Sequence, residues 1–425
     1  MPSPPALSAF SRIGRWASLR PVHEAFQWIH LHETQIMHWQ AEMVAIPAPP
    51  FSEGPRAAWI LERFRELGLA DSHIDEIGNV MGMIPGVRDL GGEGGMADAV
   101  RPCILLSAHI DTVFPAETIL EPTLDGTRLQ APGACDNGAG VAGLLAIAAA
   151  LRNASVPLPC DLLFAANVGE EGEGDLRGIR HLYQQSIYKT RIAGNVVLDG
   201  AGHELVVAQA LGSRRFLVSI RGPGGHSWTD AGTPNPIIVL ASAIAGISAL
   251  VLPTEPRTTM NVGTIEGGTS VNSIPERAVA RFDFRSTDPA QLIRLEVELH
   301  RAVEDAVIAA NRSASSRALQ FAIDTIGDRP AARLPADAAI LESLRAVDRH
   351  LKLRTEIRVG STDANVPMAM GIDAISMGAG GDGGGVHTRA EWYDSANREL
   401  GLRRILLLLL ALLENAGDLP RGPRP

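Results

Sequence analysis

Four short apolar segments of this sequence are separated by stretches of helical periodicity, and each is followed by a side chain that can bind a metal ion or carry a proton. Apolar runs of this kind, alternating with helical stretches, predict parallel strands that are covered by helices. The carboxyl ends of parallel strands meet at one edge of a sheet, so we expect the side chains that follow them to lie close together. The predicted strands are residues 104–108, 161–168, 195–198 and 374–377.

The texture of the sequence changes between residues 212 and 325. Strand-like alternation and helical spacing follow one another there in the order strand, helix, strand, strand, helix, strand, which is the outline of a small α+β domain. The segments are 214–221, 236–250, 258–265, 278–285 and 289–311, with a last strand before 325. Outside this region, helices are predicted at 33–46, 54–69, 139–152 and 400–416 from apolar spacing and start signals.

We therefore predict an α/β fold with a mostly parallel sheet flanked by helices and an inserted α+β domain. A chain of 425 residues is too long for one ordinary core and favours two domains. The catalytic α/β domain comprises residues 35–211 and 326–425, the insert comprises 212–325, and residues 1–34 form an N-terminal extension.

Composition excludes several classes of partner. The formal net charge of -10 argues against a nucleic acid or an anionic membrane, because either partner requires a basic face. The apolar run 405–413 is too short to span a bilayer and is predicted to be a buried helix. Three cysteines without a regular framework fit a reducing compartment. We expect a cytoplasmic protein, although residues 1–20, with arginines and no acids, faintly resemble a transit peptide.

Ligand-type side chains follow every predicted strand. Taken singly, each has an ordinary alternative role as a helix cap, a turn residue or a solvated edge residue. Taken together at one sheet edge, two histidines and three carboxylates can hold two divalent ions if one carboxylate bridges them. Mixed nitrogen and oxygen ligands favour zinc, with cobalt or manganese as alternatives. The residues are His109 and Asp111, then Glu170 and Glu171, then Asp199, then His387, with Asp136 at the start of a predicted helix.

Six motifs in this order resemble those of the dinuclear-zinc exopeptidases and deacylases, a family that includes peptidase T, carboxypeptidase G, aminoacylases and succinyl-diaminopimelate desuccinylase. The resemblance covers about residues 35–415. The motifs are HIDTV at 109–113, GACDNGAGVAGLL at 133–145, GEEGEG at 169–174, LDG at 198–200, GGHS at 224–227 and VHT at 386–388.

The resemblance implies a role for each residue of the predicted site. Asp136 would bridge two metal ions, His109 and Asp199 would complete one metal site, and Glu171 and His387 would complete the other. It further implies that Asp111 orients His109, that Glu170 is the general base, and that the peptide bond after the bridging aspartate is cis. We interpret the glycine-rich stretch 378–385 as a mobile loop that carries His387.

Three residues of the insert match substrate-binding positions of the family. His226 would donate to the oxyanion, and Asn272 and Arg285 would hold the substrate's backbone and carboxylate. The alternatives are a turn histidine and an exposed strand arginine. Trp228 departs from the pattern, because a small residue is usual after GGHS.

Three functions are compatible with these residues. The first is a metallo-exopeptidase for di- or tripeptides, which the resemblance favours because its peptidase branches carry aspartate at the position of Asp199. The second is an amidohydrolase that acts on N-acyl amino acids. The third, a non-catalytic binding protein on the same fold, would require a lost ligand or base, and none is missing. The resemblance also implies a homodimer formed through 212–325, in which His226 serves the partner's active site.

Overall fold

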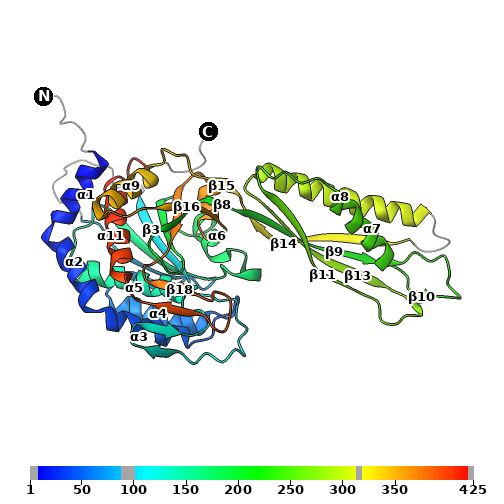
Figure 1. The fold of residues 1–425 in the computed structure, drawn as a ribbon, viewed down its shortest axis with the longest axis horizontal. Helices are drawn as coiled ribbons and strands as arrows, with labels where there is room; N and C mark the ends of the chain where they lie inside the picture. The colour runs from blue at the N-terminus through cyan, green and yellow to red at the C-terminus, as the bar shows by residue number, and fades with distance from the viewer. Residues whose placement is uncertain (1–7, 88–100, 313–317, 420–425) are drawn as a thin grey trace. The chain divides into compact units, whose positions relative to one another are not determined.

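The computed structural model describes residues 8–87, 101–312 and 318–419, which form two compact units (Figure 1). The first unit comprises Met1–Gln209 and Arg333–Pro425, and the second comprises Ala210–Ala332. The second unit extends past residue 325, where the sequence places the end of the insert, because a strand continues to Arg329. None of the described helices combines the length and apolar character needed to cross a bilayer.

The first unit contains a large mixed sheet whose central strands are parallel. Along the sheet the order is β1-β2-β6-β3-β7-β17-β8-β15, and β16 pairs with β8. Strands β6, β3, β7 and β17 run parallel to one another, while β2 and β8 flank them in antiparallel pairing. The strands are β1 Ala70–Ile74, β2 Val80–Ile84, β3 Cys103–His109, β6 Asp161–Asn167, β7 Ile192–Leu198, β8 Leu205–Ala210, β15 Ala332–Arg333, β16 Glu356–Gly360 and β17 Asp373–Met377.

Helices cover this sheet, and the four predicted strands are its parallel core. Every residue of β3, β6 and β7 is buried, as expected for strands with helices on both faces. On one face, Leu105 and Leu163 pack with Ile179 and Leu182 of α6. The helices of this unit are α1 Ala9–Ser18, α2 Arg20–Leu31, α3 Glu33–Val44, α4 Gly54–Glu66, α5 Gly138–Asn153, α6 Arg177–Gln184, α9 Ala339–Leu351, α10 Asn365–Ala369 and α11 Arg398–Glu414.

The described part of the N-terminal segment packs against the first unit. Helices α1 and α2 contact α9, α11 and α5, which come from distant parts of the sequence (Figure 1). Ile13 and Ile29 are fully buried, and the indole Nε1 of Trp16 donates to a carboxylate oxygen of Glu414 at 2.7 Å. The predicted extension therefore contributes to the core of this unit.

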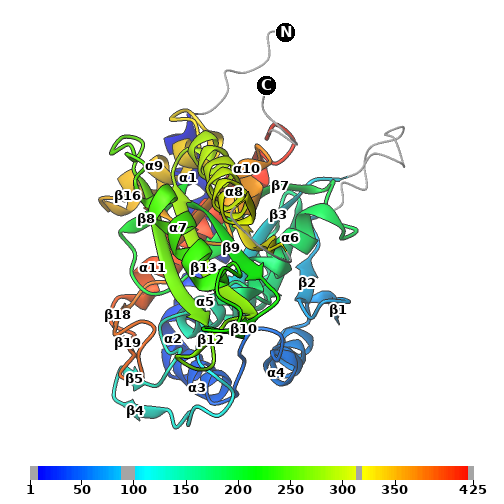
Figure 2. The same cartoon turned by 90° about the vertical axis from the view of Figure 1, so that its right-hand side faces the viewer.

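A small antiparallel sheet lies at the loops that carry two of the predicted metal ligands. Its order is β18-β19-β5-β4 (Figure 2), and it joins chain segments on either side of the second unit. The glycine-rich stretch predicted as a loop therefore contains strand β18. The strands are β4 Thr123–Asp125, β5 Arg128–Gln130, β18 Asp382–Gly384 and β19 Trp392–Asp394.

The second unit has the predicted α+β order. Its antiparallel sheet has the order β11-β13-β9-β14, with helices α7 and α8 on one face (Figure 1). Alternate residues of its strands face these helices. Among them, the phenyl rings of Phe216, Phe282 and Phe284 belong to a separate hydrophobic core with residues of α7 and α8. The elements are β9 Gly212–Arg221, β10 Gly225–His226, α7 Pro236–Ser248, β11 Thr258–Gly267, β12 Ser273–Ile274, β13 Arg277–Ser286, α8 Pro289–Arg312 and β14 Gln320–Arg329.

Candidate metal centre

The first unit gathers all five predicted metal ligands at the carboxyl edge of its parallel strands. His109 is the last residue of β3, Glu171 follows β6, and Asp199 follows β7 directly. Asp136 precedes helix α5, and His387 lies between β18 and β19. The sheet topology thus converts five positions spread along the sequence into one cluster.

The cluster contains three groups of potential ligands. One comprises His109, Glu170 and Glu171, and the other two share the carboxylate of Asp136. In the first of these two, His109 Nε2 lies 3.1 Å from Asp136 Oδ1 and 3.9 Å from Asp199 Oδ1. In the second, His387 Nε2 lies 3.0 Å from Asp136 Oδ2 and 3.0 Å from Glu171 Oε1. Each group offers three ligand atoms that all lie within 4.8 Å of one another. The two oxygens of Asp136 therefore face different groups, as a bridging ligand requires.

The unmet hydrogen-bonding capacity of this cluster fits bound cations. Asp136 Oδ1 is buried, and it faces His109 without the geometry of a hydrogen bond. A buried carboxylate oxygen with no hydrogen-bond donor is costly unless a positive ion binds it. Groups of three nitrogen and oxygen ligands match a divalent transition metal such as zinc.

Without a metal, the imidazoles carry protons that compensate the carboxylates. The hydrogen bond to Asp136 raises the pKa of His387 to about 9. Burial lowers the pKa of His109, but the surrounding carboxylates outweigh burial and raise it well above its ordinary value. Burial and the charge of Asp136 raise the pKa of Glu171. Any metal ion that binds here therefore replaces protons.

Asp111 contacts more than the histidine it was predicted to orient. Its Oδ1 lies 3.7 Å from His109 Nδ1, which lies closer, at 3.1 Å, to the backbone carbonyl oxygen of Asp111. The Asp111 carboxylate instead accepts hydrogen bonds from the backbone amides of Glu170 at 3.0 Å and Glu171 at 2.8 Å. It thereby fixes the turn that presents both glutamates, and Glu170 is itself buried beside the cluster.

Asn137 is a structural contributor that the sequence did not identify as such. The peptide bond between Asp136 and Asn137 is cis, as predicted from the resemblance. The Asn137 side chain accepts from the amides of Gly140 at 3.0 Å and Gly200 at 3.1 Å, and it donates to the Leu198 carbonyl oxygen at 2.9 Å. It therefore ties the start of α5 to the strand end that carries Asp199.

Two further buried carboxylates lie near the cluster and were not predicted. Asp363 is fully buried and accepts from Asn167 Nδ2 at 2.7 Å, and burial raises its pKa to about 7. Glu391 is fully buried and binds backbone amides next to Asp136. The only sequence signal for Glu391 is weak, namely an acidic residue four positions after His387 in VHTRAEWYD.

The three predicted site residues of the second unit lie at two different ends of its sheet. His226 in β10 pairs with Ser273 in β12, and the backbone amide of Ser227 donates to the Asn272 carbonyl oxygen at 3.0 Å, so His226 and Asn272 are neighbours (Figure 2). Arg285 pairs with Ser213 at the other end of β13, and its Nε donates to Asp283 Oδ2 at 2.8 Å. The structure therefore does not bring Arg285 together with Asn272.

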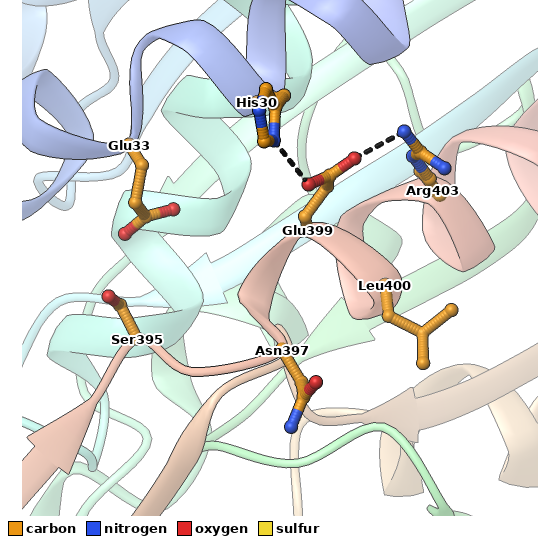
Figure 3. Close-up of a pocket in the computed structure, with 7 residues that line it drawn as sticks. All are labelled: His30, Glu33, Ser395, Asn397, Glu399, Leu400 and Arg403. Carbon is orange, nitrogen blue, oxygen red and sulfur yellow. Dashed lines mark hydrogen bonds and ion pairs between the residues drawn. The ribbon is translucent and has the colours of Figure 1, made fainter. Parts of the chain in front are cut away.

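A separate cavity of about 430 Å³ in the first unit lies at the start of α11. There Glu399 accepts from His30 Nδ1 at 2.8 Å and also pairs with Arg403, while Glu33 and Ser395 line another side (Figure 3). None of the potential metal groups among the described residues includes these side chains. His30 is thus a histidine on the surface of α2 that is hydrogen-bonded to Glu399.

Comparison with known proteins identifies relatives of this arrangement. The model of peptidase family M20/M25/M40 matches residues 105–411. A protein of Ajellomyces dermatitidis named a probable carboxypeptidase is 29% identical over 206 residues, which cover 44% of this chain and 46% of that protein. This chain thus matches about half the length of such curated relatives. A protein of Aeropyrum pernix named as a LysW-lysine/LysW-ornithine hydrolase is 28% identical over 82% of this chain and 88% of its own length.

The fold is also that of solved peptidase structures. The crystal structure of a tripeptidase from Staphylococcus aureus superposes with a TM-score of 0.70 and 20% identity, and it covers 90% of this chain and 99% of its own. At this level of identity the likeness establishes the α/β fold with its additional sheet domain.

Proposed function

Because the chain belongs to peptidase family M20/M25/M40, we propose that it is a dinuclear metallo-exopeptidase that hydrolyses di- or tripeptides. The observation that carries this proposal is the division of the Asp136 carboxylate between two ligand groups, with the carboxylate of Glu170 beside them. One ion would be held by His109, Asp136 and Asp199, and the other by Asp136, Glu171 and His387. Zinc suits these ligands first, and cobalt or manganese are alternatives.

Hydrolysis of a peptide bond needs a strong nucleophile and a polarised carbonyl group, and two bound divalent ions supply both. In the proposed reaction Glu170 takes a proton from the attacking water as its oxygen bonds to the carbonyl carbon. When the carbon–nitrogen bond breaks, Glu170 returns that proton to the leaving amine. The burial of Glu170, and the Asp111 carboxylate that fixes its backbone amide, hold this base in place.

The tautomer of His226 supports its proposed role as a donor to the oxyanion. Its Nδ1 accepts a hydrogen bond from the backbone amide of Trp228 at 3.2 Å. The proton of the neutral ring therefore resides on Nε2, which leaves that nitrogen free to donate to a developing negative charge. In this proposal the neighbouring Asn272 assists at the same substrate group.

We further propose that the second unit forms a homodimer and supplies His226 to the partner's site. Strand β11 is an edge of its sheet, pairing only with β13 among the described residues, and most of its residues are exposed. On α8, Ile293 and Val297 are 52% and 59% exposed and lie one turn apart. An open strand edge and exposed apolar residues on a helix of the same unit each favour pairing with a second copy.

The length of β9 supports delivery in trans. The chain enters the second unit at Ala210, and the ten residues of β9 separate Gly212 from Arg221 by about 30 Å. His226 follows the far end of this strand, whereas Arg285 pairs beside its near end. We therefore propose that Arg285 binds the substrate carboxylate, and that His226 and Asn272 serve the partner.

The runner-up function is hydrolysis of an N-acyl amino acid or a related amide with the same metal centre. The name of the Aeropyrum pernix relative, a hydrolase of LysW conjugates, favours keeping this alternative. A panel of dipeptides, tripeptides and acetylated amino acids, with metal analysis of the purified protein, separates the candidates. Metal-dependent release of amino acids from peptides supports the proposal, and turnover of acyl substrates alone supports the runner-up. Two bound ions with no hydrolysis of any amide would favour a binding protein.

A further inference from the structure

The segment that leads into Asp136 is held by one buried side chain, that of Glu391. Glu391 Oε1 accepts hydrogen bonds from the backbone amides of Cys135 at 2.8 Å and Asp136 at 2.7 Å. Its Oε2 accepts from the amide of Gly133 at 3.0 Å. A buried carboxylate that accepts three hydrogen bonds from backbone amides is held firmly in one position, and so is the backbone segment that donates them.

Glu391 belongs to the same loop as His387. Its backbone amide donates to the Thr388 carbonyl oxygen at 3.2 Å, which closes the turn that follows the histidine. Its backbone carbonyl oxygen accepts from the amide of Ala131 at 3.1 Å, where β5 passes into the segment of Asp136. The next residue, Trp392, begins β19 and pairs with Gln130 at the end of β5. Glu391 therefore joins the two loops that supply Asp136 and His387.

We propose that Glu391 is a positioning residue of the metal centre. By binding the amides on the Asp136 side while its own backbone closes the His387 turn, it fixes these two ligands relative to each other before a metal ion arrives. Such preorganisation lowers the cost of assembling the ligands, and outer-shell groups of this kind typically contribute 10- to 100-fold in metal affinity or activity. The inference rests on the proposed metal centre but not on the identity of the substrate.

Two substitutions grade the effect. Glu391→Ala removes all three acceptor contacts. Glu391→Gln preserves the side-chain volume and one acceptor oxygen. Its NH2 group replaces the second carboxylate oxygen, however, and has to face a backbone N–H group there. The expected order of metal affinity is therefore wild type, then Gln, then Ala.

Asp161 provides a matched control. It is also a buried carboxylate that accepts from a backbone amide, that of Gly86 at 2.9 Å, and it pairs with Arg191. However, it begins β6, at the opposite end of the strand from Glu170 and Glu171. Asp161→Asn should lower thermal stability without changing the affinity for metal.

The test is a titration of the metal-depleted full-length chain with Zn²⁺ in competition with a chromophoric chelator, together with the visible spectrum of the Co²⁺ form. We expect Glu391→Ala to weaken at least one of two sites by roughly 10- to 100-fold and to change the Co²⁺ bands, with a smaller effect for Glu391→Gln. If Glu391→Ala does not fold, the isosteric Gln variant decides. Wild-type affinities and an unchanged Co²⁺ spectrum in the folded variants would overturn the inference. A wild-type chain that binds no divalent ion would instead refute the metal centre itself.

Discussion

Adding a single methyl group at Gly140 should damage the metal centre, whereas the same change at Gly14 should stabilise the protein. Both glycines lie in helices of the first unit, α5 and α1. A Cβ atom at Gly14 meets nothing within 4 Å. At Gly140 it would lie 2.1 Å from Asn137 Oδ1 and 2.6 Å from the Leu198 carbonyl oxygen. The second contact is with backbone, which cannot rotate away.

The expected magnitudes follow from these contacts. Alanine in place of a helical glycine whose Cβ position is open gains about 0.5–1 kcal/mol in the free energy of unfolding, which is the result expected for Gly14→Ala. At Gly140 that gain is opposed by overpacking, which costs about 1–3 kcal/mol. The Asn137 side chain must also leave its three hydrogen bonds, each worth about 1 kcal/mol. The net loss for Gly140→Ala is therefore about 3–5 kcal/mol, and displacement of Leu198 moves the adjoining Asp199.

Urea unfolding of the metal-free chain, followed by tryptophan fluorescence, measures both effects, because five of the six tryptophans lie in the first unit. Zinc affinity of the two variants completes the comparison. Gly140→Ala should lose about tenfold or more in affinity, and Gly14→Ala should bind zinc as the wild type does. Stabilisation of both variants, or unchanged zinc affinity in Gly140→Ala, would refute the close packing of α5 against the strand end that carries Asp199.

Five further predictions concern the chemistry. Glu170→Gln should retain its metal ions, unlike Asp136→Ala, and lose roughly two to four decades of kcat; near-normal turnover would remove Glu170 as the base. Because the pKa of metal-free His387 is about 9, the metal dissociation constant should fall about tenfold per pH unit between pH 7 and 9, which competition titrations at several pH values would detect. The ion pairs of His387 stabilise the metal-free protein fully below pH 6.5, and this stabilisation is lost as the pH rises through 9. The melting temperature of the metal-free protein should therefore fall between pH 6.5 and 9, whereas that of the metal-bound protein should not. Arg285→Ala should raise KM for peptides with a free carboxylate but not for amidated peptides, and equal effects on both would exclude the carboxylate contact. Subunit exchange between inactive Glu170→Gln and His226→Ala proteins should restore about a quarter of wild-type activity, whereas verified exchange without recovery would exclude action in trans.

The parallel core of the fold and the cluster of ligand-type side chains at its edge could be predicted because local signals indicate them. An apolar run that ends at His109 or before Asp199 specifies both a buried strand and the side chain at its carboxyl end, and strand direction then brings these ends together. The buried helix α11 followed from its apolar run in the same way.

The remaining features depend on contacts between distant segments, which local patterns do not encode. Nothing in the sequence around Ile13 or Trp16 shows that α1 packs against α9 and α11. Likewise, Glu391 acquires its partners only because β19 pairs with β5 across the intervening second unit. The alternation around Arg285 predicted its strand correctly. The strand is long, however, so Arg285 lies at the end of β13 that is far from Asn272.

The position of β17 between β7 and β8 has a consequence for how the protein is synthesised. Strands β7 and β8 are complete when the nascent chain reaches residue 210, yet the strand that lies between them emerges only after the whole second unit has been translated. At 5–20 residues per second this delay lasts roughly eight to thirty seconds. During that time β7 has an apolar, unpaired edge, which is prone to pair with other chains and is a natural substrate for ribosome-associated chaperones. The sheet of the second unit uses only residues of that unit, so the second unit can fold while the sheet of the first unit still lacks β17.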